Sequence, residues 1–449
     1  MIDNLTELFL DQIFEMSKLD LMPSLVIQAK KCMLDYLGAT FAGSEIQKNK
    51  LMKLLDLITS ENEEVSVIGF NRKSDLKSAV FLNGLSSHVA DFDDGANSGI
   101  IHIGSPVFST LIPLAEKEHI SPERFLRGVI VGYETSLRLA NSIQPSHKKL
   151  GYHATGTCGT IGSSIAACVS LNFSKVEMKN AFSSAIVAAS GTLKVLEDGS
   201  ELKPYNVGRA SLVGFLSAIM GRAGFAGPDD VLLGDNGFFS MMTKSFEVSH
   251  LKKRKDTYAI EKVYFKPYAA CRYCHPAIEA AIKIRPKIKF AYDNIKEVNV
   301  KTYVWAVAKH DHADIQGITS AKMSIPYSVA VALYSGKADI EEFEIDRIKN
   351  SDVLSLAKKV KVAADDELTS LFPQKSAAIV ELVTNDGASF VERVDYPKGE
   401  PENPLSEEEI KDKFMTLAMY GNKTKEEAEK IIECVWDLEN RLGDLFDLL

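Results

Sequence analysis

The sequence predicts a mainly helical protein in which both chain ends form a large all-helical domain, with a smaller α+β domain inserted between them. Apolar residues recur at helical spacing from Leu5 to about Tyr258, with little strand-like alternation. Alternation with a period of two appears only after that point, and two helix-start signatures then close the chain. We expect the helical domain to comprise residues 1–262 and 402–449, and the inserted domain to comprise residues 263–401.

The first part of the chain shows the signatures of consecutive helices. Apolar residues have helical spacing from Leu5 to about Gly43, and the pattern resumes over Ser74–Val89 and Val107–Glu118. Ser121-Pro122 is a helix-start signal, with Ser as the N-cap and Pro as the first helical residue. Ser174-Lys-Val-Glu177 has the pattern of a capping box and predicts a further helix start.

Two segments of the helical part are rich in Ala, Ser and Gly and carry almost no charge: Gly159–Leu171 and Ala181–Leu193. Small residues let neighbouring backbones approach closely, and helices that are apolar all round are buried. We therefore expect both segments to be helices that are buried on all sides within a large core.

The inserted part shows strand signatures. Val298–Val304 alternates with a period of two, as a half-buried strand does. Ala378–Val383 and Phe390–Val394 flank Asn385-Asp-Gly387, which is a strong hairpin signal. Val360–Val362 is a plausible third strand. Helices are expected between these strands near Pro276–Lys283, Pro326–Tyr334 and Ile345–Leu356.

The end of the chain is expected to return to the helical domain. The Pro-rich segment Tyr396–Pro401 marks the exit from the inserted domain. Two capping boxes follow, Ser406 with Glu409 and Thr424 with Glu427, and they predict two closing helices.

Composition and charge exclude several classes of protein. The 449 residues are 45% hydrophobic and 25% charged, which is typical of a globular chain and not of a disordered or collagenous one. With 52 Lys and Arg against 61 Asp and Glu, the net charge is −9, so general binding to nucleic acid or to an anionic membrane is not expected. An anionic substrate must instead be held by a few well-placed Lys, Arg and His residues.

The cysteine count and the placement of charged and apolar residues indicate where in the cell the protein is located. Six cysteines are too few for a disulfide framework in a chain of this length. The N-terminal segment carries acids where a secretory signal would carry bases, and no uncharged apolar run reaches the roughly 18 residues of a spanning helix. We therefore expect a cytoplasmic protein.

Three carboxylates lie within four residues, at Asp91, Asp93 and Asp94, and His102 follows in a loop rich in Gly and Ser. Like charges so close together repel one another unless the fold compensates them, which is typical of sites with perturbed titration. These acids could transfer protons or bind a metal together with His102, or they could simply cap the end of a helix. Magnesium motifs of this kind usually come in pairs, and the sequence has no second one.

Two further clusters contain His153, Lys203 and Arg209. His153 precedes a turn rich in Gly and Thr that opens the most apolar helix, whose first backbone N–H groups could hold a carboxylate. The glycine spacing is not that of a dinucleotide site, and a capping loop with a surface histidine is the alternative. Lys203 and Arg209 lie on the approach to the apolar helix 210–220, where either could bind an anion or be an ordinary surface charge.

The fourth cluster is the segment Phe265–Pro276. Its Cys271-Arg-Tyr-Cys-His275 run matches the C-x-x-C-H pattern of haem attachment, but such attachment normally follows export and the chain shows no export signal. A zinc site would need a further ligand, and no paired motif is visible. We expect neither haem nor a metal here, and we interpret Lys266 and Arg272 as carboxylate anchors and His275 as a helix-start donor or acid.

The four clusters together resemble one family. From about Leu25 to Val435 the chain is similar to the MmgE/PrpD family, which includes 2-methylcitrate dehydratases and cis-aconitate decarboxylases. The matching segments are Asp91–His102, Gly151–His153, Lys203–Gly208, Gly224–Pro228, Phe265–His275 and Ala321–Tyr327.

The resemblance implies a homodimer with a cofactor-free active site at the interface of the helical domain and the inserted domain, which acts as a lid. By position it implies the site residues Asp91, Asp94, His102, His153, Lys203, His275 and Tyr327. The expected substrate-binding residues are Lys266, Arg272, His275, Tyr327 and Arg209. Two departures concern the loop around the substrate. Gly95 stands where the family often has Thr or Ser, and His102, one residue farther from Asp91 than usual, precedes Ile103 and not Pro.

The residue types suit chemistry next to a carboxylate. Breaking a bond there leaves negative charge on carbon and oxygen, which neutral His can initiate as a base and which Lys203 and Arg272 can stabilise. Dehydration, decarboxylation and epimerisation could all use this set of groups. The resemblance implies a cofactor-independent lyase acting on a small di- or tricarboxylate. An epimerase or isomerase of an amino-dicarboxylate such as iminodisuccinate, or a non-catalytic carboxylate-binding protein, are the alternatives.

Overall fold

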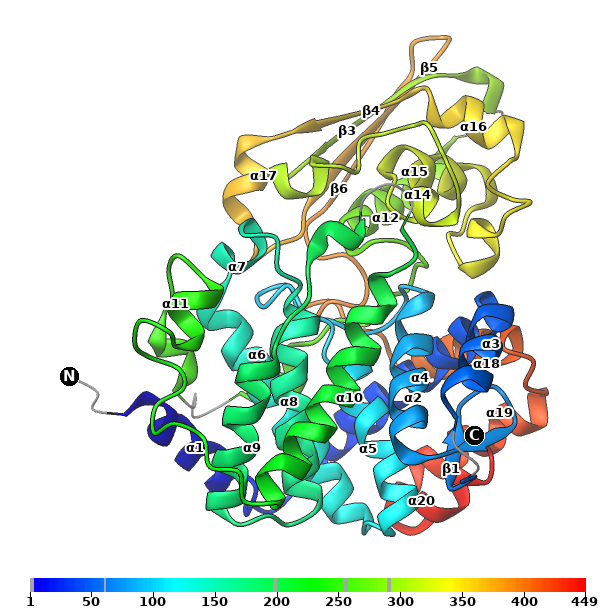
Figure 1. Ribbon diagram of the computed structural model, residues 1–449. Helices are drawn as coiled ribbons and strands as arrows, with labels where there is room; N and C mark the ends of the chain where they lie inside the picture. Colours follow the sequence, from blue (N-terminus) through cyan, green and yellow to red (C-terminus); the bar gives the residue numbers. More distant parts are fainter. Residues whose placement is uncertain (1–3, 60–61, 197–199, 253–256, 289–291) are drawn as a thin grey trace. The chain divides into compact units, whose positions relative to one another are not determined.

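The computed structural model describes residues 4–59, 62–196, 200–252, 257–288 and 292–449. They form two compact units: Met1–Tyr264 together with Ser406–Leu449, and Phe265–Leu405. The first unit is built almost entirely of helices and the second combines helices with a sheet, so the predicted mainly helical fold class is confirmed (Figure 1).

The first unit contains helices from both ends of the chain. Its helices before residue 264 are α1 (Leu5–Met16), α2 (Pro23–Ile46), α3 (Lys48–Ile58), α4 (Leu76–Val89), α5 (Gly104–Glu118), α6 (Pro122–Ile143), α7 (Ser146–Lys149), α8 (Ala154–Ser170), α9 (Lys175–Ala188), α10 (Lys203–Arg222) and α11 (Phe238–Met242). The C-terminal helices are α18 (Glu407–Tyr420), α19 (Lys425–Trp436) and α20 (Leu438–Phe446). The capping boxes at Ser174, Ser406 and Thr424 are present as predicted.

Helix α8 lies at the centre of this unit. Every residue of α8 is buried, and the helix packs against α6, α9, α10 and α5 (Figure 1). The predicted burial of the 159–171 segment is therefore confirmed. The expectation for Ala181–Leu193 was wrong in extent, because α9 ends at Ala188 and exposes Val187. Close approach of α4 and α10 depends on glycine, since a Cβ on Gly84 would lie 2.8 Å from the Cα of Gly208.

The expectation that the chain before Tyr258 is all-helical was also wrong. Strands β1 (Val65–Val67) and β2 (Arg72–Ser74) form a short antiparallel hairpin in which Val65 pairs with Ser74. Strand β1 has the sequence Val-Ser-Val and does alternate, but three residues are too few for an alternation of period two to stand out in the sequence.

The second unit contains a four-stranded sheet with the order β4-β3-β5-β6. Its strands are β3 (Ile295–Thr302), β4 (Val360–Ala364), β5 (Ala378–Thr384) and β6 (Ser389–Val394). β4 runs parallel to β3, and the other neighbouring strands are antiparallel; Val300 pairs with both Val362 and Val380. The antiparallel pairing of β5 with β6 confirms the predicted hairpin, and burial alternates along β5.

The described residues of the second unit also form six α-helices. They are α12 (His275–Ile284), α13 (Val304–Val307), α14 (Ile318–Lys322), α15 (Ile325–Ser335), α16 (Ser351–Ala357) and α17 (Asp366–Leu371). Of these, α12, α13, α15 and α17 contact the sheet. α12 contacts β5 and β6, and α15 contacts β4 and α12. The predicted helix Ile345–Leu356 begins later than expected, because the Asn350 side chain accepts hydrogen bonds from the N–H groups of Asp352 and Val353 and so caps α16.

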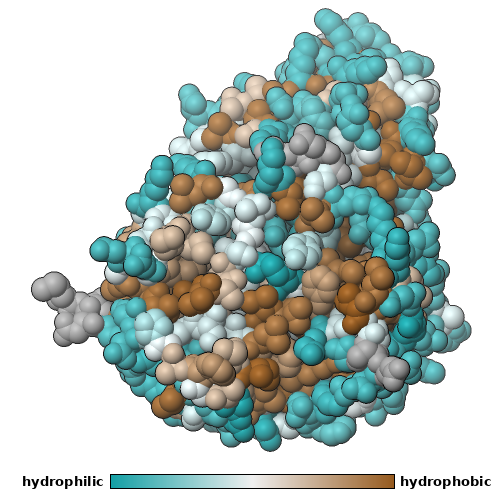
Figure 2. Space-filling model, in the orientation of Figure 1, coloured by the Kyte–Doolittle hydropathy of each residue, from teal (hydrophilic) through white to brown (hydrophobic). Residues whose placement is uncertain are grey.

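Two surface properties complete the description. None of the described helices combines the length and apolar character that crossing a membrane requires. Apolar side chains gather on the face of the first unit where α10 lies (Figure 2). The exposed apolar residues of α9, α10 and their flanks are Val176, Val187, Leu202, Tyr205, Leu216, Ile219, Met220 and Phe225. The predicted cytoplasmic location stays a prediction.

Candidate active site

The acidic cluster lies where helix α4 ends and the chain turns back toward α5. Asp91 follows α4 in the left-handed region, with φ of +53°, a conformation that Asp tolerates better than most residues. The loop is closed by pairing between Ala96 and Ile101, and α5 begins at Gly104. The three acids therefore follow the end of a helix, and all of them (Asp91, Asp93 and Asp94) are buried.

Asp93, in the loop after α4, contacts His88, which lies in the last turn of that helix. The Nδ1 atom of His88 lies 3.0 and 2.9 Å from the two carboxylate oxygens of Asp93, and the Ser105 hydroxyl donates to Asp93 Oδ2 at 2.6 Å. Because a carboxylate accepts hydrogen bonds, His88 carries a proton on Nδ1.

Asp94 has both carboxylate oxygens engaged in the fold. Oδ2 accepts from the Tyr133 hydroxyl at 2.6 Å, and Oδ1 accepts from the N–H of Gly104, the first residue of α5, at 2.9 Å. Burial, with the nearby charge of Asp35, raises the pKa of Asp94 to about 7. Asp94 contributes to the cluster through its backbone, because its carbonyl oxygen lies 2.7 Å from Nδ1 of His102.

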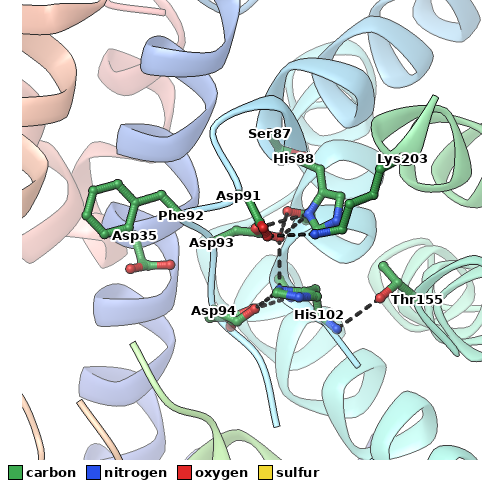
Figure 3. Close-up of polar contacts among 12 residues, drawn as sticks. Asp35, Ser87, His88, Asp91, Phe92, Asp93, Asp94, His102, Thr155 and Lys203 are labelled. Carbon is green, nitrogen blue, oxygen red and sulfur yellow. Dashed lines mark hydrogen bonds and ion pairs between the residues drawn. The ribbon is translucent and has the colours of Figure 1, made fainter. Parts of the chain in front are cut away.

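His102 is fixed on two sides. Its backbone N–H donates to the Thr155 hydroxyl at 3.0 Å, and its Nδ1 faces the Asp94 carbonyl (Figure 3). A carbonyl oxygen only accepts, so Nδ1 carries the hydrogen and a neutral ring has its lone pair on Nε2. Its side chain is 14% exposed. His102 is thus oriented to accept a proton through Nε2.

His153 has the opposite tautomer. It is the N-cap residue of α8, and its Nδ1 lies 3.2 Å from Nδ2 of Asn206. The same Asn206 nitrogen donates to the Thr192 carbonyl, which identifies it as the amide NH₂ group. His153 therefore accepts at Nδ1 and carries its hydrogen on Nε2. Burial, followed by the neighbouring His88, holds the pKa of His153 well below its usual value, so the ring is neutral at pH 7.

Lys203 supplies a positive charge to the cluster from the first residue of α10. Its Nζ lies 2.7 Å from Oδ1 of Asp91, and the two side chains are 19% and 12% exposed. Two details of the sequence interpretation were wrong here. Gly156 and its neighbours form the first turn of α8 and no separate turn, and α10 begins at Lys203 and not at Ala210.

The structure brings Asp91, His102, His153 and Lys203 together. The centroid of the His88 ring lies 4.8 Å from that of His102 and 6.1 Å from that of His153. Figure 3 shows Asp91, Lys203, His88 and His102 turned toward one another. The donor atoms of His88, Asp91 and His102 all lie within 4.8 Å of one another, so these three residues could also share a metal ion.

Arg209 has a different position. Its guanidinium donates to the carbonyl oxygens of Gly156, at 2.9 Å, and of Ser190. It therefore joins α10 to α8 and to the segment after α9, and its hydrogen bonds among the described residues are to backbone carbonyls. Its role as a substrate-binding residue stays a prediction.

The remaining predicted residues belong to the second unit. Lys266 is buried, and buried Arg272 forms an ion pair with Glu400 at 2.6 Å. Arg272 Nη1 donates to Nδ1 of His275 at 2.9 Å, and His275 Nε2 donates to the Ala270 carbonyl at 3.1 Å. The buried Tyr327 hydroxyl donates to the Glu342 carbonyl at 2.7 Å. Arg272 and His275 thus form one cluster, whereas the hydroxyl of Tyr327 is engaged elsewhere in the same unit.

Some residues of the first-unit cluster were missed by sequence reasoning. His88, Thr155 and Asn206 each contact a predicted residue directly. Asn206 could have been found, since it lies three positions after Lys203 and so shares its face of the helix. His88 had only a weak signal, one turn of α4 before the acids.

Comparison with known proteins decides the family. The MmgE/PrpD N-terminal domain model matches residues 12–251, and the MmgE/PrpD C-terminal domain model matches residues 268–438. The chain belongs to the MmgE/PrpD family. It is 26% identical to cis-aconitate decarboxylase of Homo sapiens, covering 98% of this chain and 93% of that protein. It is 26% identical to cis-aconitate decarboxylase of Aspergillus terreus, covering 96% and 92%, and 24% identical to that of Mus musculus, covering 98% and 92%.

Proposed function

We propose that this MmgE/PrpD protein is a lyase that acts on a small di- or tricarboxylate, of the cis-aconitate decarboxylase or 2-methylcitrate dehydratase type, without a cofactor. The observation that supports it most is the pairing of tautomers in the first unit. His102 presents a lone pair at Nε2 and His153 presents a hydrogen at Nε2, beside the ion pair of Lys203 and Asp91. Names of relatives that are about 25% identical support the same class of reaction.

The proposed chemistry assigns one task to each group. Lys203 binds a substrate carboxylate and stabilises the negative charge that develops on it, while Asp91 holds the ammonium group in place. His102 takes a proton at Nε2 and, as the imidazolium, gives it up again, whereas His153, neutral at pH 7, donates a hydrogen bond from Nε2–H to the oxygen that becomes negative. The low exposure of these side chains strengthens each electrostatic interaction.

The same groups can account for every bond and proton in either lyase reaction. In decarboxylation, a C–C bond breaks, CO₂ leaves, and the electron pair that remains on carbon takes a proton from the imidazolium form of His102, which solvent then protonates again. In dehydration, neutral His102 removes a proton from carbon and passes it to the hydroxide, which leaves as water while His153 hydrogen-bonds to the leaving oxygen. Each reaction needs one proton donor next to one cation, and a dehydration also needs the base.

A solvent-exchange experiment tests this proposal. The purified protein is incubated in D₂O with cis-aconitate, 2-methylcitrate, citrate or iminodisuccinate, and each mixture is followed by NMR. We expect one of the first three acids to be converted to an unsaturated acid with loss of CO₂ or water. Deuterium entering iminodisuccinate without net conversion would instead indicate an epimerase, and no change in any acid would indicate a binding protein. Either result would contradict the lyase proposal.

We also propose that the protein forms a homodimer through the apolar face of α9 and α10. The exposed side chains of Val187, Ile219 and Phe225 lie on these helices or directly after them, and a contiguous apolar surface of this kind is typical of an interface. The dimer is tested by light scattering after size exclusion. The unmodified protein should have twice the chain mass, and Ile219→Glu should shift it toward the monomer. A monomeric unmodified protein would refute this assignment.

A further inference from the structure

The mechanism proposed above gives no task to His88, a buried histidine of the same cluster. His88 is 1% exposed and lies in the last turn of α4. Its Nδ1–H is held by Asp93, whose carboxylate is fixed in turn by the Ser105 hydroxyl. The lone pair is therefore on Nε2, and that atom is buried with no hydrogen-bond partner among the residues that the structure describes. A buried acceptor without a donor is costly, so it indicates a missing ligand.

His102 has the same arrangement as His88. In both rings an oxygen acceptor binds Nδ1–H, namely the Asp93 carboxylate for His88 and the Asp94 carbonyl for His102. Both rings therefore carry the Nε2 lone pair, and their centroids are 4.8 Å apart at an interplanar angle of 68°. An oxygen acceptor behind the ring is the usual environment of a histidine that binds a metal, because it fixes the tautomer and raises the basicity of the other nitrogen.

The carboxylate of Asp91 completes the set of donors. One ligand atom from each of His88, Asp91 and His102 lies within 4.8 Å of the other two. Two imidazoles and one carboxylate suit divalent first-row transition ions such as Zn²⁺ or Co²⁺, whereas Mg²⁺ prefers sites made only of oxygen. The three residues come from the end of α4 and the loop that follows, so one short segment supplies the whole set.

We propose that His88, Asp91 and His102 bind a divalent transition-metal ion, and that the bound ion inhibits the enzyme by occupying Nε2 of His102. The inhibition rests on the proposed function of His102, but the binding does not. Lys203 opposes the ion, because its ammonium group lies 2.7 Å from Oδ1 of Asp91 and competes for the carboxylate. The ion pair thus limits metal affinity and keeps the histidines available for substrate.

The opposing role of Lys203 makes the test specific. Zn²⁺ affinity of the full-length chain, after treatment with a chelator, is measured by competition with a chromophoric indicator in the absence of substrate. His88→Gln should weaken binding by at least about tenfold, and Asp93→Asn by about tenfold to a hundredfold through loss of the support behind the ring. Lys203→Met should strengthen binding by about tenfold or more, although it lowers activity. His119→Asn, at an exposed left-handed position, is the control and should leave affinity unchanged.

Visible absorption of the Co²⁺-loaded protein gives a second measurement. We expect the visible absorption bands of Co²⁺ bound by few ligands, some of them nitrogen. His88→Gln should change these bands, and His119→Asn should not. The proposal is overturned if the unmodified protein and Lys203→Met bind no Zn²⁺ below millimolar concentration, or if His88→Gln binds it as tightly as the unmodified protein. Zn²⁺ that binds without slowing turnover would overturn the inhibition alone. Failure of the lyase proposal would leave the Zn²⁺ and Co²⁺ measurements unaffected.

Discussion

Replacing the buried histidine of α7 should change how the stability of the first unit depends on pH. His147 is fully buried, its Nδ1–H donates to the Met242 carbonyl at 2.7 Å, and its Nε2 accepts from the Thr157 hydroxyl at 2.8 Å. The Nε2 contact requires the neutral ring, because a protonated ring has no lone pair there, whereas the Nδ1–H contact is present in both protonation states. Burial lowers the pKa of His147 to about 4, whereas an unfolded histidine titrates near about 6.5.

The size of the effect follows from these two pKa values. Above about pH 6.5 the ring is neutral in both the folded and the unfolded chain, so its contribution to stability is fully present. As pH falls toward 4, only the unfolded chain takes up the proton, and the free energy of unfolding decreases. Between pH 7 and pH 5 the loss through His147 is about 2 kcal/mol. His147→Gln keeps one donor and one acceptor but does not titrate, so it should lack this loss.

The assay is urea unfolding at pH 7 and pH 5 in a Trp305→Phe background. Trp436, on α19, then reports on the first unit alone, since the chain has two tryptophans. The difference in unfolding free energy between the parent and His147→Gln should change by about 2 kcal/mol between the two pH values. Other groups, including Asp94, titrate in both proteins and cancel in this difference. A constant difference, within about 0.5 kcal/mol, would refute the assignment of a buried neutral His147.

Two further substitutions test the packing of each unit. Gly84→Ala should destabilise the first unit by about 1–3 kcal/mol, because the new Cβ would lie 2.8 Å from the Cα of Gly208. Unchanged urea unfolding of this variant would show that α4 and α10 are farther apart. Arg272→Met should destabilise the second unit by about 3–5 kcal/mol, because it leaves the buried carboxylate of Glu400 without its cation. Adding Glu400→Gln should recover part of that loss in thermal unfolding, and no recovery would argue against the ion pair.

Local signals in the sequence predicted most of the helices and strands. The capping boxes at Ser174, Ser406 and Thr424 were found because each depends on residues three positions apart. Strand β5 was found because it precedes Asn385-Asp-Gly387, a turn sequence typical of hairpins. The hairpin of β1 and β2 was missed, since the Val-Ser-Val alternation of β1 covers only three residues.

Contacts between residues far apart in the sequence could not be predicted from local patterns. Asp91 and Lys203 are 112 positions apart, so no spacing rule could pair them, and their association was expected only from the resemblance to a family. Glu400 was missed as the partner of Arg272 for the same reason. The tautomers of His102 and His153 depend on the Asp94 carbonyl and on Asn206, contacts that only the folded chain creates.

The most direct test of the proposed site is the loss of turnover in two variants, with the acid that the NMR experiment identifies as substrate. His102→Ala and Lys203→Ala should each lower kcat/KM by at least about a hundredfold, through loss of a base and of charge stabilisation. His119→Asn and Lys77→Ala, at exposed positions of α5's end and of α4, are the matched controls and should keep full activity. Nearly normal turnover in both His102→Ala and Lys203→Ala would contradict the account.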